Sequence, residues 1–204
     1  GVSGELVIPG NITVLSQRAF SACHKITSVI ISEGVKEIGK ASFYNCNYST
    51  SIQLSTSLEI IGDNALNGMA ISSITIPSGV TFLGKSAFAR TKLVSVTVPS
   101  NVKRISENCF SHCKELKTVI IENGVEYIES RAFFSAGPIE SIVIPESMVE
   151  ITYDAFEDVK TINNVFFNAI CYEYDQYSYD DNINTNGNQD ENYVVTINPY
   201  GRFA

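Results

Sequence analysis

The residues best suited to nucleophilic chemistry are two cysteine–histidine neighbours, Cys23-His24 and His112-Cys113. A thiol nucleophile needs an imidazole base within hydrogen-bond reach and a third group that orients the base. The side chains of adjacent residues normally diverge. The two histidines also lie four repeats apart in the pattern described below, which separates them by about 19 Å in a stack of strands. The sequence therefore predicts no enzymatic activity and no cofactor.

The five cysteines are an odd number, in a chain too long to require disulfide cross-links. Cys23, Cys46 and Cys113 hold one position of the repeat, and Cys109 holds another where several copies have alanine. We predict that these four are free thiols, buried as small apolar side chains. A disulfide between Cys23 and Cys46 is the alternative, although parallel Cβ vectors fit its geometry poorly. No C-x-x-C or paired-histidine spacing indicates zinc.

One segment near the end of the chain, Asn182-x-Asn184-x-Asn186-Gly187, has the spacing of the start of an EF-hand calcium loop. Its first position is Asn rather than Asp, and its twelfth is Tyr193 rather than the bidentate Glu that supplies the strongest ligand. We expect a solvated, Asn-rich loop here, with calcium binding as the alternative, and we predict no metal ligand.

These residues are positioned by an internal repeat. The segments LSQRAF, IGKASF, IGDNAL, LGKSAF, ISENCF, IESRAF and ITYDAF end at intervals of 23, 23, 22, 22, 23 and 23 residues. Their last residues are Phe20, Phe43, Leu66, Phe88, Phe110, Phe133 and Phe156. The repeat can be written as L-x-x-L-x-L-x-x-x-V-x-x-I-x-x-x-x-F-x-x-C. This pattern predicts a short strand, a turn containing Pro and then Gly or Asn, a second extended piece and a helical turn.

A unit of this size cannot bury its apolar face alone, so neighbouring units must stack around one continuous core. We predict a leucine-rich-repeat solenoid over residues 1–167: a right-handed superhelix of seven 22–23-residue repeats. It should consist mainly of short parallel strands with short helical turns, and the phenylalanines should form an internal ladder. We expect residues 168–204 to form an atypical C-terminal cap with an Asn/Asp/Tyr-rich loop and a strand at Tyr193–Ile197. A flexible linker toward an anchor is the alternative.

The phrases ITIPSGVTFLGKSAF and VTVPSNVKRISENCFSHCKEL resemble the BspA-like leucine-rich repeat family over about residues 5–167. A strand ending in Pro, then V-x-x-I-G and A-F-x-x-C, characterises that family. Departures are local: Ser49 and Leu66 replace the expected Leu and Phe, and several copies lack the Cys. The resemblance implies a bacterial or protozoan secreted or cell-surface protein, and adhesion or protein binding rather than catalysis.

The composition agrees with a protein that buries a core, because 44% of the 204 residues are apolar and 18% are charged. No run of eighteen apolar residues occurs, which excludes a membrane-spanning helix within this chain. Because the chain begins at Gly1 and has no signal-type apolar stretch, we expect a processed or trimmed product whose targeting segment has been removed. The net charge of −8 argues against nucleic acids and anionic membranes as partners.

The candidate binding surface consists of two outward columns on the predicted strands. One reads Ser28, Ser51, Ser73, Ser95, Thr118, Ser141 and Asn164, and the other reads Val7, Ile30, Gln53, Thr75, Thr97, Ile120, Val143 and Phe166. Such a flat, weakly charged face is where solenoids typically bind partners, although these residue types also simply suit a strand surface. We predict ligand contacts at Ser73, Thr75, Ser95, Thr97, Thr118 and Ile120.

A second candidate surface is a basic belt, because residues 64–106 contain no acidic residue. The belt comprises Lys85, Arg90, Lys92, Lys103 and Arg104. It could recognise an anionic polysaccharide or an acidic protein patch, or be merely solvated. The function that we predict is a secreted or cell-surface recognition module that binds an extracellular protein, such as a host matrix or surface protein. A structural spacer of a larger surface protein and a glycan-binding module are the alternatives.

Overall fold

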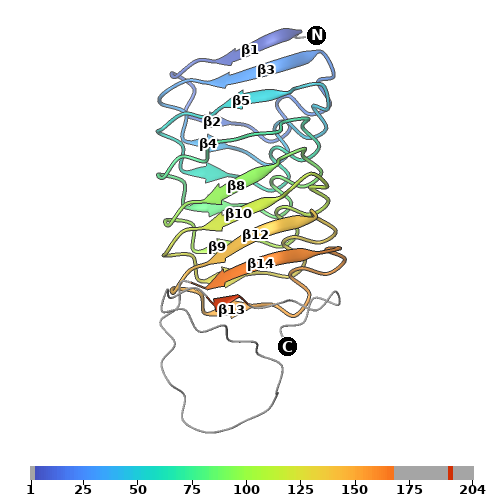
Figure 1. Cartoon of the computed structure of the whole chain (residues 1–204). Helices are drawn as coiled ribbons and strands as arrows, with labels where there is room; N and C mark the ends of the chain where they lie inside the picture. Colours follow the sequence, from blue (N-terminus) through green and yellow to red (C-terminus); the bar gives the residue numbers. More distant parts are fainter. Residues whose placement is uncertain (1–2, 168–192, 195–204) are drawn as a thin grey trace, which may run out of the picture.

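The computed structural model describes residues 3–167 and 193–194 and is a parallel β-solenoid in which each repeat forms one turn (Figure 1). Each turn runs through a longer strand, which only the fourth repeat lacks, then a bend, a two-residue strand and a segment of tight turns that returns to the next repeat. The predicted repeat solenoid is therefore confirmed.

The longer strands lie side by side and form the long-strand wall. They are β1 (Gly4–Ile8), β3 (Ile26–Ile31), β5 (Ser51–Gln53), β8 (Ser95–Val98), β10 (Thr118–Ile121), β12 (Ile139–Ile144) and β14 (Ile162–Phe167). All of their pairings with one another are parallel. The final strand, β15 (Tyr193–Val194), pairs antiparallel with β14.

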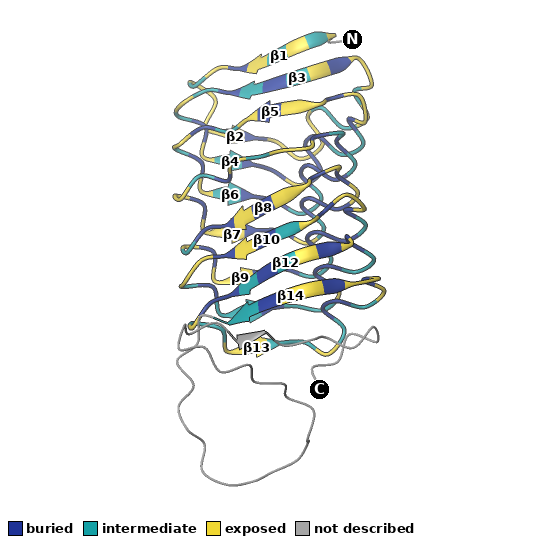
Figure 2. Ribbon diagram, in the orientation of Figure 1, coloured by how far each residue is buried: buried dark blue, intermediate teal, exposed yellow. Residues whose placement is uncertain are grey.

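The two-residue strands form the short-strand wall on the opposite side of the core. They are β2 (Val14–Leu15), β4 (Glu37–Ile38), β6 (Ile60–Ile61), β7 (Phe82–Leu83), β9 (Arg104–Ile105), β11 (Tyr127–Ile128) and β13 (Glu150–Ile151). In most of them the second residue is buried, as the V-x-x-I pattern predicts. Alternating buried and exposed positions run along both walls (Figure 2).

The phenylalanines form the predicted ladder, but in two stacks. Phe20 and Phe43 lie parallel with ring centroids 5.5 Å apart. The second stack holds Phe88, Phe110, Phe133 and Phe156, with centroids 5.0 to 5.4 Å apart. Leu66, fully buried, occupies the place between the two stacks. Met69, which stands where the consensus has Cys, is larger than Cys. Leu66 and Met69 together therefore fill the space that Phe and Cys fill in other repeats.

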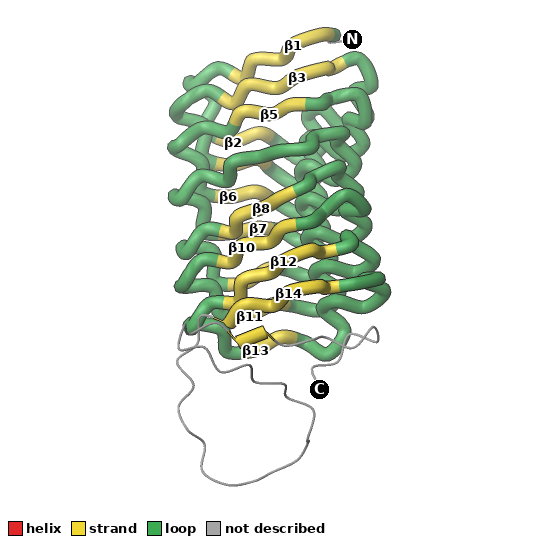
Figure 3. Tube along the Cα trace, viewed as in Figure 1, coloured by secondary structure: helices red, strands yellow, loops and turns green. Residues whose placement is uncertain are grey.

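The predicted helical turns are wrong, because the described residues contain no helix (Figure 3). Each repeat instead has a turn column, residues 16–23 in the first, with left-handed backbone at two positions in the first six repeats and at Asp158 alone in the seventh. In the first repeat these are Arg18 (φ 59°) and Ala22 (φ 56°). Right-handed helices exclude such residues. The cost is offset by hydrogen bonds between repeats: the N–H groups of Arg18, Phe20 and Ala22 donate to carbonyls of the second repeat at 2.7 to 2.9 Å.

Both walls are interrupted, at different places. The long-strand wall divides into sheets β1-β3-β5 and β8-β10-β12-β14-β15, because residues 72–76 form no strand. The short-strand wall divides between β7 and β9. There the residue after the buried aliphatic changes from Gly39, Gly62 and Gly84 to Ser106. A Cβ at Gly84 would clash with the backbone nitrogen of Asp63, so the glycine repeats pack more closely than a larger residue permits.

The predicted cap, residues 168–204, lies outside the described residues apart from β15, and so does the Asn-rich segment considered for calcium. The family-typical solenoid thus extends at least through β14. Whether residues 168–204 form a cap stays a prediction.

Candidate binding surfaces

The strand pairing brings together most of the predicted contact residues on the long-strand wall. Ser95 is in register with Thr118, and Thr97 with Ile120. Ser141 and Val143 continue the two columns on β12. Thr118 is half-buried, whereas Ser95, Thr97 and Ile120 are exposed, with 41% of Ile120 accessible. Four of the six residues therefore form one contiguous patch.

The other two predicted contacts lie where the wall is interrupted. Ser73 and Thr75 are exposed, but their segment forms no strand. It is joined to the next repeat by bonds from Lys92 N and Val94 N to the carbonyls of Ile71 and Ser72, both 3.1 Å. Ile74, the inward residue here, is only half-buried, whereas Val96 on β8 is buried. The patch is therefore best defined on β8, β10 and β12.

The two outward columns carry no charged side chain from β3 to β14. Charge appears only beside them, where Lys117 and Glu140 form an ion pair of 2.8 Å. Removing hydroxyl groups and β-branched side chains from water costs much less free energy than removing charged groups. This part of the wall can accordingly be covered by a partner without leaving a buried charge.

The basic belt is largely neutralised by acids of the following repeats. Lys85 pairs with Glu107 at 2.8 Å, Lys103 with Glu126 at 3.0 Å and Arg104 with Glu129 at 2.8 Å. The hydrogen bond that Lys85 donates to Glu107 raises the pKa of Lys85. Among the described residues, Arg90 and Lys92 have no ion pair. The structure thus reduces the free charge of the belt to these two residues.

Sequence reasoning missed this pairing, although its signal is present. Every ion pair in the described part joins a cation of one repeat to an acid 22 to 26 residues later, such as Lys36 to Glu59 or Arg131 to Glu157. The belt was defined on residues 64–106 alone, and the acids that pair with it, Glu107, Glu126 and Glu129, lie after that segment.

Neither cysteine–histidine pair is arranged for nucleophilic catalysis. Cys113 is fully buried, and its thiol donates to the carbonyl of Phe88 at 3.2 Å. Burial raises its pKa to about 11, which opposes formation of a thiolate. The His112 ring contacts Phe134 edge-on at 5.2 Å. His24 bonds the side chain of Asn47 through Nδ1 at 2.9 Å.

The predicted burial of the cysteines is confirmed for Cys46, Cys109 and Cys113, which are fully buried free thiols. Cys23 is also free, but it is only half-buried, in the first repeat that the structure describes. In the part of the chain that the structure describes, no group of three His, Cys, Asp or Glu side chains is arranged to hold a metal ion.

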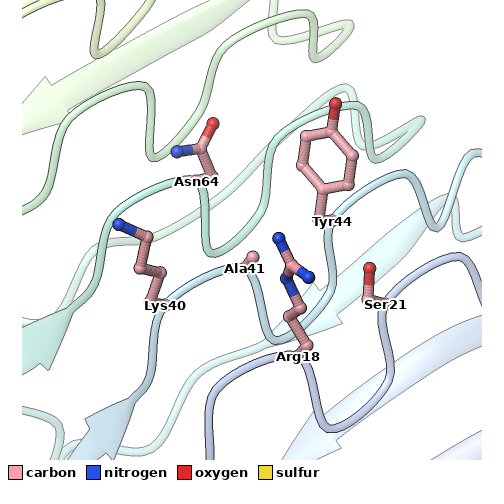
Figure 4. Close-up of a pocket in the computed structure, with 6 residues that line it drawn as sticks. All are labelled: Arg18, Ser21, Lys40, Ala41, Tyr44 and Asn64. Carbon is pink, nitrogen blue, oxygen red and sulfur yellow. The ribbon is translucent and has the colours of Figure 1, made fainter.

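A further hollow lies on the turn column of the first three repeats, with a volume of about 320 Å³. It is lined by Arg18, Ser21, Lys40, Ala41, Tyr44 and Asn64 (Figure 4). No motif pointed to these residues. Their only signal is that Arg18 and Arg131 hold the same repeat position, while the repeats that follow them differ: Ala41 and Tyr44 stand where the other has Asp154 and Glu157.

The fold and these surfaces define a leucine-rich-repeat solenoid. The family model for the BspA type leucine-rich repeat region, in six copies, matches residues 3–94 and 82–197. The chain belongs to this family. The match continues beyond residue 167, where the resemblance in the sequence had ended.

Three solved structures show the same fold. A leucine-rich repeat protein from Bacteroides ovatus is 19% identical, with a TM-score of 0.55 over 82% of this chain and 66% of that one. A leucine-rich cell surface protein from Faecalibacterium prausnitzii is 24% identical, with a TM-score of 0.63 over 83% and 48%. The pneumococcal vaccine antigen PcpA is 17% identical, with a TM-score of 0.53 over 81% and 40%.

The chain thus spans between 40% and 66% of the length of these three proteins. Comparison with curated proteins finds no match. Within residues 3–167 and 193–194, no helix is long and apolar enough to cross a membrane.

Proposed function

We propose that this chain is a secreted or cell-surface recognition module of the adhesion type, which binds an extracellular protein on its long-strand wall. The observation that carries the proposal is the uncharged patch on β8, β10 and β12. There Ser95 and Thr118, and Thr97 and Ile120, stand side by side in the parallel register. Protein interfaces deplete charged residues at their centres and place polar groups at the rim. The Lys117–Glu140 pair beside the patch corresponds to such a rim.

Two findings support an extracellular setting. The chain belongs to the BspA type leucine-rich repeat family, and one protein of similar fold is described as a cell surface protein. The same comparisons make a non-enzymatic role the better proposal, because the relatives are described as leucine-rich repeat proteins. A spacer within a longer surface protein and a glycan-binding module remain the alternatives.

The test is binding of the purified chain to a panel of extracellular-matrix proteins and polysaccharides, followed by two double variants. Ser95→Glu with Thr97→Arg places long charged side chains on the patch without altering the buried Val96. We expect it to abolish binding to the protein partner.

The matched control is Arg90→Glu with Lys92→Glu, because these cations have no ion pair to lose within the described residues. We expect it to leave binding to a protein partner unchanged. Loss of binding only in this control, together with a steep decrease of affinity with salt, would assign the ligand to the basic belt and contradict the proposal. Retention of binding in both variants would exclude both surfaces as the binding site and favour the predicted C-terminal cap or the spacer.

A further inference from the structure

The hollow on the turn column differs from the rest of that column in its charge balance. Arg18 and Arg131 hold the same repeat position and both adopt left-handed backbone, with φ of 59° and 55°. Arg131 Nε donates to Glu157 Oε2 at 2.7 Å and lies 4.0 Å from Asp154 Oδ2. The next repeat therefore supplies two carboxylates to this arginine.

The second repeat supplies no carboxylate to Arg18. The positions equivalent to Asp154 and Glu157 are Ala41 and Tyr44. Among the described residues, Arg18 has no ion-pair partner. The second cation, Lys40, is partly balanced by Asp63 at 3.5 Å. The hollow thus keeps a free guanidinium beside open space.

We propose that this hollow binds the carboxylate of a sugar acid, a uronic or sialic acid unit, through Arg18. A guanidinium accepts a carboxylate in a bidentate arrangement, the same chemistry that Glu157 supplies to Arg131. The proposal does not depend on the proposed function, because the turn column is a different face from the long-strand wall.

The other lining groups favour a sugar acid over a simple acidic side chain. Among the described residues, the hydroxyls of Ser21 and Tyr44 have no protein hydrogen-bond partner, so they are available to ring hydroxyl groups. The side-chain oxygen Oδ1 of Asn64 accepts a hydrogen bond from Asn67 Nδ2 at 3.0 Å, which leaves the side-chain nitrogen Nδ2 of Asn64 as a donor. A volume of about 320 Å³ is at the small end of ligand pockets and suits a single unit. An aspartate side chain would use Arg18 alone.

The test is titration of the isotope-labelled chain, monitored by amide chemical shifts, with N-acetylneuraminic acid, glucuronic acid and methyl glucoside. We expect the two acids to produce saturable shifts confined to the turn columns of the first three repeats. Methyl glucoside, which lacks the carboxylate, should bind at least about tenfold more weakly, as expected for loss of a charged hydrogen bond. Equal affinity for the uncharged sugar, or no saturable shift with either acid, overturns the proposal.

N-acetyl-aspartate amide distinguishes the other source of a carboxylate. Weaker binding of this compound than of the sugar acids supports the proposal. Equal or tighter binding means that the site recognises acidic protein side chains and overturns the assignment to a sugar.

Two variants test the mechanism. Arg18→Gln removes the guanidinium, and Tyr44→Glu supplies to Arg18 the carboxylate that Glu157 supplies to Arg131. We expect each to weaken sugar-acid binding by at least about tenfold, and Arg131→Gln to leave it unchanged. Circular dichroism melting shows whether each variant is folded, and Arg18→Lys, which retains charge, should give an intermediate affinity. Unchanged binding in folded Arg18→Gln, or loss in folded Arg131→Gln, contradicts the proposal.

Discussion

The first three repeats of the solenoid contain a stacked pair of rings, Phe20 and Phe43, whereas the last four contain a stack of four rings that begins at Phe88. Leu66 lies between the stacks, one turn before the segment that forms no strand. We call repeats one to three the N-terminal part and repeats four to seven the C-terminal part. Both parts bury the same columns of side chains, so in both the inner positions must be apolar and fit the core.

The outer positions of the two parts differ because the repeat does not constrain them. Arg131 in the C-terminal part is neutralised by Glu157, whereas Arg18 in the N-terminal part borders an open hollow. The uninterrupted patch of β8, β10 and β12 lies in the C-terminal part. The comparison indicates that stability depends on the inner columns, while recognition depends on outer residues that vary from one repeat to the next.

The largest expected difference is in thiol reactivity. Cys109 and Cys113 in the C-terminal part are fully buried, whereas Cys23 in the N-terminal part is half-buried. The fifth cysteine, Cys171, is first replaced by serine. In this variant we expect Cys23 to react with a maleimide at least about a thousandfold faster than Cys109 or Cys113, because labelling of those two requires unfolding. Mass spectrometry of labelled peptides measures the rates. Rapid labelling of Cys109 in the native protein would contradict the buried ladder.

The next effect is on the free energy of unfolding. Phe110→Ala removes a fully buried ring that is stacked on both faces and should cost about 3–5 kcal/mol. Phe20→Ala should cost less, because Phe20 is half-buried and stacks on Phe43 alone among the described rings. Urea denaturation measures both. A loss below about 1 kcal/mol for Phe110→Ala, or equal losses for the two variants, would contradict this difference.

The junction between the stacks provides a smaller effect. Leu66→Phe alone adds volume beside the larger Met69 and should destabilise the protein by about 1–3 kcal/mol. Leu66→Phe combined with Met69→Cys restores the Phe-x-x-Cys pair found at Phe43 and Cys46, and should recover most of this loss. A double-mutant cycle measures the coupling. Additive effects of the two substitutions would show that their volumes do not compensate.

Acid sensitivity at Glu33, in the N-terminal part, gives the smallest of these effects. The Glu33 carboxylate accepts hydrogen bonds from the N–H and hydroxyl groups of Thr56 and Ser57, which lower its pKa from 4.5 to about 2. Because the folded-state pKa is lowered, this stabilisation is present above pH 4.5 and is lost as the pH falls through about 2. We expect Glu33→Gln to lower the melting temperature slightly at pH 7 and to lessen its decrease between pH 5 and pH 2.

The control is Asn123, which lies in the C-terminal part and uses an uncharged amide for the same purpose. Its Oδ1 accepts from Ser147 N at 3.1 Å. Asn123→Ala should lower the melting temperature equally at all pH values. If Glu33→Gln leaves the acid dependence unchanged, the exposed carboxylate makes no measurable contribution.

The solenoid and its columns could be predicted from the sequence because the repeat fixes every inward position. Val96, Val119 and Ile142 recur at intervals that only a stacked structure can satisfy, and the strand register confirms their alignment. The turn column could not be predicted in this way. Arg18 and Ala22 are not residue types that indicate left-handed backbone, and they adopt it because their N–H groups bond to the second repeat.

The candidate sites were predicted only in part, for a related reason. The patch around Ser95 and Thr97 follows from the strand pattern alone, whereas the neutralisation of Lys85 by Glu107 depends on side chains one repeat apart. The hollow beside Arg18 depends on what its neighbours lack, namely the acids that surround Arg131. Such information appears only when equivalent positions of successive repeats are compared.

The central claim, that the long-strand wall of the C-terminal part binds the protein partner, is tested most directly by methyl resonances of the labelled chain in the complex. Thr97, Ile120 and Val143 present methyl groups on adjacent strands of the patch. We predict that these resonances shift or broaden on binding, whereas those of the buried Val96 and of Ala89 on the turn column change little. Changes confined to the turn column or the basic belt, with Thr97, Ile120 and Val143 unaffected, would contradict the claim.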